Sequence, residues 1–404
     1  MTRAKQMGTI NHSLKNVCFP AGTLLPGGVP IEDAATMVRQ YDGEMVELKT
    51  RAGDIKATAN HNLFVRKRRH KVGLTPIRLL DPEWVPIGDV RVGDFVCSPK
   101  FEPWQQGHET KIDLSDMLDN VGGPWYGYHN KRSAFSVDLT PEAAWFIGLY
   151  TAEGSATSGF AKVSLGFKES EIALGQRAVS AINSMGYETS IFRRENGHDV
   201  NILKGRLFSE WLRKNVGTNA HNKKIPGIIL YHSDSAIRKA FIEGLLDGDG
   251  HNYTRDGNYR QILGVVSKGL IRDLVLLLAQ DGLGGFYSKM TKGPRKIGNS
   301  YTNKTLNLEK FDFATNGKAT TQRFLNGKWV ESTSASWKTD EYGVWYHVKA
   351  IDRSQFSGPV YNIQNTPKHR YVAQSLLVRN CSDEEINDDL EGEGFELPDD
   401  PPTP

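Results

Sequence analysis

The pattern of apolar and polar positions divides the chain into two kinds of segment. Residues 18–105 contain short apolar runs, such as Glu44–Lys49 and His61–Val65, which are separated by Gly, Pro, Asn and Asp. This pattern predicts an all-β unit with tight turns. A similar pattern returns from about residue 344 to Asn380. The two ends of the folded chain are therefore expected to share one β unit.

The middle of the chain has helical spacing instead. Thr140, Pro141 and Glu142 supply the N-cap residue, first-turn proline and acidic first turn with which helices begin. Further helices are expected over Ser235–Asp249 and Ser267–Gln280, with mixed segments between them. The segment 106–140 is aromatic- and Gly-rich without a clear period, and we expect a linker there. The pattern thus predicts an α+β unit inserted into a β unit.

Composition limits the class of protein. A chain of 404 residues is long enough for two or three domains. It has no apolar run of the roughly 18 to 20 residues that cross a bilayer, and its start lacks the apolar stretch of a secretory signal. A cytoplasmic protein without a membrane partner is the expectation.

The net charge of +3 hides an asymmetry. The segment 381–404 has ten acidic residues and no Lys or Arg, which leaves residues 1–380 with 50 basic against 37 acidic residues. A body this basic suits a polyanion such as DNA, because neutralising phosphates releases counterions. A surplus of surface lysines would give the same charge. The acidic, Pro-rich tail is expected to be disordered.

The three cysteines are Cys18, Cys97 and Cys381. Their odd number argues against a disulfide framework, and no spacing suggests structural zinc. Cys18 and Cys381 stand near opposite ends of the folded part, and Cys381 follows Asn380.

Four features follow one another in the order that protein splicing requires. They are the cysteine Cys18, the T-x-x-H spacing of Thr58 and His61, the histidine His369 near the C-terminal end, and the pair Asn380-Cys381. A cysteine thiol can attack the preceding carbonyl and turn the peptide into a thioester, and a histidine can protonate the departing nitrogen. A second cysteine can take the acyl group, and an asparagine can cyclise and cut the chain after itself. Each piece alone is common, whereas the ordered set is specific.

The segments around these residues resemble an intein. CFPAGTLL, ATANHNLF, WVPIGDVRVGDFV and VYNIQNTPKHRYVAQSLLVRNC are similar to the family's conserved blocks. The resemblance implies the all-β Hint horseshoe, with excision at Val17/Cys18 and Asn380/Cys381 and no cofactor for splicing. It also implies the roles: Cys18 as first nucleophile, Thr58 and His61 assisting it, Cys381 as acceptor, and His369 and Arg379 promoting the cyclisation of Asn380.

Three positions depart from the intein pattern. Arg379 stands where a histidine is usual, and it can donate hydrogen bonds but cannot shuttle a proton. Asn362 replaces an acidic residue, which removes a candidate base near Cys381. Val17 is β-branched and could hinder the first step. Slow splicing, or a splicing-impaired precursor whose only activity is DNA cleavage, nicking or binding, is therefore kept as the alternative hypothesis.

The inserted unit contains an internal repeat. FIGLYTAEG and IEGLLDGDG lie 96 residues apart and share their Gly, Leu, acidic and Gly positions. A glycine inside a helix costs roughly 1 kcal/mol, which is explained if two helices approach closely there. Glu153 and Asp249 then stand at two helix C-termini, where the dipole disfavours an anion and a divalent cation would favour it. Two unrelated helices that end in a C-cap glycine are the simpler alternative.

These motifs resemble the LAGLIDADG (DOD-type) homing endonucleases. The resemblance covers roughly residues 141–335 and implies two pseudo-symmetric αββαββα-like halves, with Mg²⁺ held by Glu153 and Asp249. AHNKKIPGIIL resembles the family's lysine block, which implies Lys224 or Lys223 near the scissile phosphate, Lys224 being the better match in register. The implied activity is cleavage of double-stranded DNA for intein homing. Glu153 in place of Asp keeps nicking of one strand possible.

The expected organisation has six parts. They are an N-extein remnant (1–17), two Hint segments (18–105 and 336–380), a linker (106–140), the endonuclease (141–335) and a C-extein segment (381–404). We expect a monomer with host exteins in cis. A hedgehog-type autoprocessing domain would need neither Asn380-Cys381 nor the insert, and a free-standing nuclease would not need Cys18.

Overall fold

The computed structural model describes most of the chain between Cys18 and Asn380. The described residues are 18–68, 79–118, 135–255, 258–297, 300–302, 305–313, 322–325, 328–331, 337–363 and 366–380. Val17 and Cys381, predicted at the two splice junctions, lie outside the described residues. The part of the linker between residues 119 and 134 also lies outside them.

One ten-stranded sheet contains strands from both ends of the chain. Its central order is β25-β26-β6-β8-β24-β4-β5, and β1, β23 and β7 pair with it at the sides. We call this body the β unit. Its strands are β1 (Phe19–Pro20), β4 (Met37–Thr50), β5 (Asp54–Thr58), β6 (Asn62–Arg66), β7 (Glu83–Pro86), β8 (Phe95–Pro99), β23 (Trp337–Thr339), β24 (Gly343–Asn362), β25 (Arg370–Ala373) and β26 (Leu376–Arg379). The hairpin β2 (Leu24–Leu25) and β3 (Val29–Pro30), the helix α1 (Ile31–Ala34) and the 3-10 turns η1 (Ile87–Asp89) and η6 (Pro367–His369) complete it.

The long antiparallel pair β4–β24 joins the two ends. It runs from the Val348–Thr50 pair to the Asn362–Met37 pair, with one register shift near residue 349. Along β4, exposed and less exposed positions alternate, as a strand with one covered face requires. Pairing between residues 298 to 325 positions apart confirms that the β pattern at the two ends belongs to one sheet.

The segment 106–140 contains structure of its own. After the 3-10 turn η2 (Pro103–Gln105), β9 (Lys111–Asp113) pairs antiparallel with β10 (Ser136–Asp138), and η3 (Ser115–Met117) lies between them. Ile112 and Val137 are buried in this pair. Such short strands give too few residues for a period to be visible in the sequence.

The inserted unit repeats the order αββαββ twice, and the final helix of the expected αββαββα halves is present in the first half only, as far as the described residues extend. The first half consists of α3 (Pro141–Glu153), β11 (Gly154–Thr157), β12 (Phe160–Leu165), α4 (Glu169–Ser184), β13 (Glu188–Arg194), β14 (Gly197–Leu203) and α5 (Arg206–Asn215). After α6 (Gly227–Leu230), the second half consists of α7 (Ser235–Asp249), β15 (Gly250–Arg255), β16 (Asn258–Val265), α8 (Lys268–Gln280), β17 (Gly285–Lys292) and β20 (Leu306–Phe313). The hairpins β18 (Arg295–Ile297) with β19 (Ser300–Thr302) and β21 (Gln322–Leu325) with β22 (Lys328–Glu331) are additions to it.

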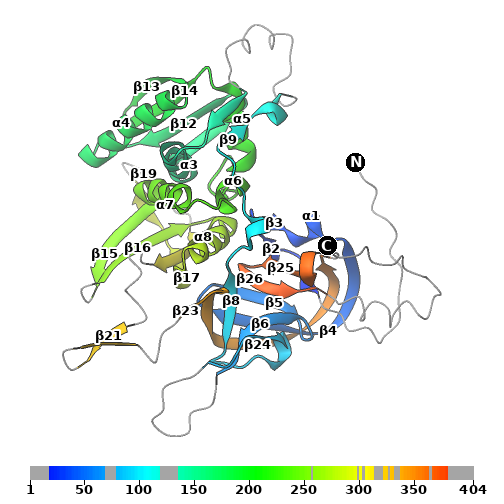
Figure 1. The fold of residues 1–404 in the computed structure, drawn as a ribbon. Helices are drawn as coiled ribbons and strands as arrows, with labels where there is room; N and C mark the ends of the chain where they lie inside the picture. The colour runs from blue at the N-terminus through cyan, green and yellow to red at the C-terminus, as the bar shows by residue number, and fades with distance from the viewer. Residues whose placement is uncertain are drawn as a thin grey trace.

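Both four-stranded sheets have the same strand order. The orders β11-β12-β14-β13 and β15-β16-β20-β17 each follow first, second, fourth, third. The register repeats as well, because Gly154 pairs with Val163 in the first sheet and Gly250 with Leu263 in the second. All paired strands of the described part are antiparallel, so the chain combines antiparallel sheets with helices. In Figure 1 the blue and orange strands of the β unit form one body, and the green and yellow inserted unit lies beside it.

The helices α3 and α7 pack against each other through glycines. Their N-caps are Thr140, which accepts from the Ala143 amide at 3.2 Å, and Asp234. A Cβ atom added to Gly148 would lie 2.1 Å from the Phe241 carbonyl oxygen, and one added to Gly244 would lie 1.9 Å from that of Trp145. Only glycine allows the two backbones to come this close, which confirms the sequence prediction of a close helix pair. None of the described helices has the length and apolar character that crossing a membrane takes.

Replacing Gly244 with alanine is expected to destabilise the chain by about 3 kcal/mol, because the added methyl group overpacks two helix backbones. Urea unfolding of both proteins at one pH measures the change. Gly264 on β16 is the matched control, since a Cβ atom there meets no atom within 4 Å. Equal stabilities of Gly244→Ala and Gly264→Ala would contradict the close packing.

Candidate functional site

Two carboxylates stand at the C-terminal ends of the central helices. Glu153 is the last residue of α3 and Asp249 the last of α7. The glycines that follow them have extended backbone angles, with φ −87° at Gly154 and −77° at Gly250. A Cβ atom on either would lie 2.3 Å from the carbonyl oxygen of Tyr150 or Leu246. These glycines are therefore required by lack of space and not by a left-handed C-cap.

Both carboxylates have raised pKa values. Burial raises the pKa of Glu153 to about 7, and the charges of Asp249 and Glu171 add to the rise. Loss of water around its carboxyl group raises the pKa of Asp249 to about 6, although Lys223 and Lys292 oppose it. Glu153 is partly buried and Asp249 is exposed, and the like charge of Asp249 beside Glu153 disfavours the charged form of Glu153, as in functional carboxylate pairs.

Lys223 completes this group, while Lys224 does not. Lys223 is 4% exposed, and its Nζ donates to the carbonyl oxygens of Tyr150 at 2.8 Å and Gly154 at 2.9 Å. Burial lowers the pKa of its ammonium to about 7, against the opposing effect of Asp249 and Glu153. The charge of Lys224, which the sequence register favours, acts on Asp273 instead, and both lysines line a cavity of about 600 Å³ between α8 and the β2–β3 hairpin. Spacing from Pro226 does not tell which of two adjacent lysines reaches the carbonyl oxygens at the end of α3.

The donor set fits a small divalent cation. The described part of the chain has no group of three or more His, Cys, Asp and Glu side chains that could hold a metal ion. Glu153 and Asp249 nevertheless supply two carboxylates whose mutual repulsion a cation would relieve. Mg²⁺ is commonly held by one or two carboxylates, with the remaining ligands from water and substrate phosphates. A pair without further protein ligands is consistent with that kind of site.

The second candidate site surrounds Cys18 in the β unit. The Cys18 amide donates to the Thr58 Oγ1 atom at 3.0 Å, and the Thr58 amide donates to the Cys18 carbonyl at 3.0 Å. The His61 amide donates to the Thr58 carbonyl at 2.9 Å, and its ring lies 4.2 Å from that of Phe19, centroid to centroid. Cys18, Thr58 and His61 are completely buried. The T-x-x-H turn thus lies directly against the backbone of Cys18.

The C-terminal residues reach the same region through the hairpin β25–β26. The Asn380 amide donates to the His369 carbonyl at 3.1 Å, and Arg379 pairs with Arg370. Val378 of β26 pairs antiparallel with Leu63 of β6. Asn380 follows this pair by two residues, and His61 precedes it by two. The fold therefore brings the segments that carry Cys18, Thr58 and His61 and those that carry His369 and Asn380 to one sheet, although they are up to 362 positions apart.

Some residues of these sites gave no signal in the sequence. The Tyr371 hydroxyl donates to the Oδ1 atom of the buried Asn362 at 2.9 Å, and its ring lies 6.3 Å from that of Phe19. The Tyr150 ring lies 4.2 Å from the Lys223 ammonium. Their aromatic character is equally typical of a core, so only the three-dimensional contacts identify them.

This chain is similar in sequence to regions of several different known proteins. No protein-family model matches the chain. The relatives include the ATP-dependent DNA helicase Hel308 of Thermococcus kodakarensis (25% identity, 85% of this chain, 32% of the relative) and the DNA-directed RNA polymerase subunit Rpo1C of Methanocaldococcus jannaschii (28%, 60% and 27%). An iron-sulfur cluster assembly SufBD family protein of Mycobacterium tuberculosis is 23% identical over 88% of this chain and 39% of its own length. The chain thus spans about a third of the length of these relatives.

Two solved structures show a limited likeness. The N-terminal LAGLIDADG domain of WhiA has a TM-score of 0.27 at 13% identity, with 50% of this chain and 84% of that domain covered. I-DmoI in complex with DNA and Ca has a TM-score of 0.28 at 11% identity, with 44% and 85% covered.

Proposed function

We propose that the chain is a self-splicing element that carries a DNA endonuclease. The observation that supports the splicing proposal is one sheet, built from both chain ends, that joins the contacts of Cys18 with Thr58 to the hairpin of His369 and Asn380. The Hint-type horseshoe and the domain boundaries expected from the sequence are part of the same proposal. Splicing requires a nucleophile at the start of the element and an Asn-Cys pair at its end, and the sequence supplies both.

The range of relatives supports an inserted element. A helicase, an RNA polymerase subunit and an iron-sulfur assembly protein have different names, yet each is similar to this chain over only 27% to 39% of its length. A segment shared by otherwise different proteins is what a mobile, self-removing insertion would leave. The host protein around residues 1–17 and 381–404 need not resemble any of them.

The splicing steps follow from the residues. The Cys18 Sγ atom attacks the Val17 carbonyl, while Thr58 holds the scissile amide and His61 protonates its departing nitrogen. Cys381 then attacks the thioester carbonyl, which transfers the acyl group to Cys381 and frees the Cys18 thiol.

The C-terminal step releases the element. The Asn380 side-chain nitrogen attacks its own carbonyl carbon, so that a succinimide forms and the Cys381 amine leaves. That amine finally displaces the thioester sulfur, which joins Val17 to Cys381 through a peptide bond. His369, whose carbonyl accepts a hydrogen bond from the Asn380 amide, and Arg379, which precedes Asn380, are the candidates for stabilising the leaving group.

The thioester is the intermediate to trap. In an Asn380→Ala variant the last step is blocked, so dithiothreitol should release residues 1–17 from the full chain. Intact mass spectrometry measures this release. The matched variant carrying Cys18→Ala as well should stay intact, and release from it would contradict Cys18 as nucleophile. A stable Asn380→Ala precursor would favour the alternative, a splicing-impaired chain with only its DNA-directed activity.

The second activity is cleavage of double-stranded DNA at the carboxylate pair. Glu153 and Asp249 would hold Mg²⁺, which when bound would neutralise charge on the attacking and leaving oxygens. The Lys223 ammonium, held by two backbone carbonyls beside them, would stabilise negative charge on the scissile phosphate. Two carboxylates related by the internal repeat suit the two strands of a duplex. The natural target would be the host gene with codons 18–380 removed.

Binding of Mg²⁺ is expected to weaken about tenfold between pH 8 and pH 6. The carboxyl groups have pKa values of about 7 (Glu153) and about 6 (Asp249), so both lose negative charge as the pH falls through this window. Lys223, with a pKa of about 7, gains positive charge over the same range. Calorimetric titration with Mg²⁺ alone at pH 6, 7 and 8 measures the effect. Glu153→Gln should weaken binding and flatten the profile; an unchanged affinity across this range would refute the assignment.

A further inference from the structure

Helix α8 fixes the loop that carries Lys223. The Ser267 hydroxyl, at the N-cap of α8, donates to the Lys223 carbonyl at 2.6 Å. One turn and a half later, the Asp273 carboxylate accepts from the Ile225 amide at 3.2 Å. The backbone on both sides of Lys224 is thereby tied to one helix. Because the Lys223 side chain extends from this backbone toward Glu153, α8 controls where its ammonium lies.

The same helix also holds the β unit. The second oxygen of Asp273 accepts from the Gly27 amide at 2.8 Å, in the β2–β3 turn. The carbonyl of Arg272 accepts from the Ser375 hydroxyl at 2.8 Å, in the turn of the β25–β26 hairpin. That hairpin is also joined to β2, since the Gln374 amide donates to the Leu24 carbonyl at 2.8 Å. Its other end carries Asn380 and His369.

Asp273 is an unusual residue for a contact that only holds the β unit and the inserted unit together. It is completely buried, and burial raises the pKa of its carboxyl group to about 7, although the two backbone donors and Lys224 oppose the rise. A buried carboxylate is a weak way to stabilise a contact that apolar side chains could make. Two directed hydrogen bonds to two different loops fix geometry, which apolar contact does not do to the same degree.

We propose that Asp273 is a positioning residue shared by both candidate sites, holding the loop of Lys223 and the β2–β3 turn against one helix. This inference rests on the proposed function. The inserted unit is then part of the splicing machinery through α8, and the β unit is part of the support of the endonuclease site. Removal of the insert as a whole would remove the brace of the Asn380 hairpin.

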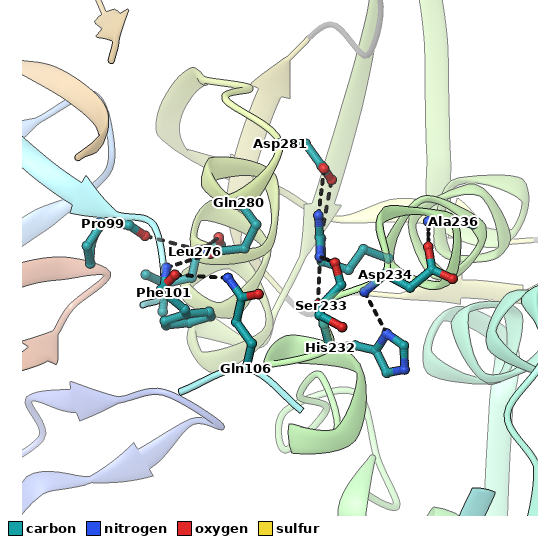
Figure 2. A network of polar contacts seen from close by, with 11 residues as sticks. Pro99, Phe101, Gln106, His232, Ser233, Asp234, Ala236, Leu276, Gln280 and Asp281 are labelled. Carbon is teal, nitrogen blue, oxygen red and sulfur yellow. Dashed lines mark hydrogen bonds and ion pairs between the residues drawn. The ribbon is translucent and has the colours of Figure 1, made fainter. Parts of the chain in front are cut away.

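The test compares Asp273→Asn with Gln280→Ala in the full chain. Gln280 lies at the far end of α8 and also joins the two units, because it accepts from the Phe101 amide at 2.7 Å and donates to the Pro99 carbonyl at 3.1 Å. Figure 2 shows Gln280 beside Phe101 and Pro99, at the end of β8. The hydrogen bonds of Gln280 reach Leu276, Pro99 and Phe101 and not the loop of Lys223 or the Asn380 hairpin directly, so its loss reports adhesion between the units.

Asp273→Asn is expected to lower two rates about tenfold each: single-turnover cleavage of the target duplex and cleavage of the chain after Asn380. Its affinity for the duplex should stay unchanged, because Asp273 is buried. Gln280→Ala should change neither rate. Given a wild type that is active in both assays, two results would overturn the shared role while the proposed function stands. The first is equal behaviour of the two variants, and the second is a fall of only one rate in Asp273→Asn. A wild type without either activity would refute the proposed function, and the positioning role with it.

Two milder variants keep the test decisive if Asp273→Asn does not fold. Ser267→Ala removes the contact with the Lys223 carbonyl and should slow only DNA cleavage. Ser375→Ala removes the contact with the Arg272 carbonyl and should slow only cleavage after Asn380. Equal effects of both variants on both rates would show general loosening and overturn the inference.

Discussion

Asp249→Asn is expected to lower the rate of double-stranded DNA cleavage by about 10³-fold, because it removes half of the carboxylate pair that holds the metal. The substrate is a duplex of the gene sequence that encodes residues 1–17 joined directly to residues 381–404, with Mg²⁺ present. A gel assay under single-turnover conditions measures cutting of each strand separately. Loss of both strand cuts is expected if the pair acts together, and loss of one if each carboxylate serves one strand.

Asp247 supplies the matched control on the same helix turn. It is exposed, its Oδ2 atom accepts from the Trp145 indole at 2.8 Å, and its pKa is raised, first by loss of water around the carboxyl group. Asparagine can still accept that hydrogen bond, so Asp247→Asn should cut at nearly the wild-type rate. Equal losses in the two variants would mean that the helix end, and not the Asp249 carboxylate, is what matters.

Thr58→Val is expected to slow thiol-dependent release of residues 1–17 about 10²-fold in the Asn380→Ala background. Valine keeps the shape of the threonine side chain but loses the oxygen that accepts the Cys18 amide at 3.0 Å. The scissile amide is then no longer held while its nitrogen departs. Mass spectrometry over time after addition of dithiothreitol gives the rate.

Thr50 offers a control of the same type. It is completely buried, and its hydroxyl donates to the Gly53 carbonyl at 2.6 Å in a turn away from Cys18. Thr50→Val should lower the stability of the β unit yet leave the release rate of the folded protein nearly unchanged. If both valine variants slow release equally, the effect of Thr58 is structural and the assignment of its role fails.

The elements with strong local signals were predictable from the sequence. The Thr140-Pro141 start of α3, the span of α7 and the glycines between these helices follow directly from capping, periodicity and the internal repeat. The β pattern at both chain ends predicted one shared sheet, which β4 and β24 form.

The contacts that position the candidate sites were not predictable in this way. The choice between Lys223 and Lys224 depends on which side chain reaches the end of α3, 69 or more residues away. Asp273 is a polar residue in an apolar helix pattern, and its two partners come from different units of the chain. The strands β9 and β10 are too short to give a period. Non-local packing decides all three, and a local pattern does not record it.

The measurement that tests the central claim most directly is the intact mass of the purified full chain over time, beside a Cys18→Ala, Asn380→Ala control. The account predicts a 363-residue species that spans Cys18–Asn380, together with a ligated peptide of 41 residues from the two flanks. Persistence of the 404-residue chain, as in the control, would contradict splicing and leave the chain as an endonuclease within a silent β unit.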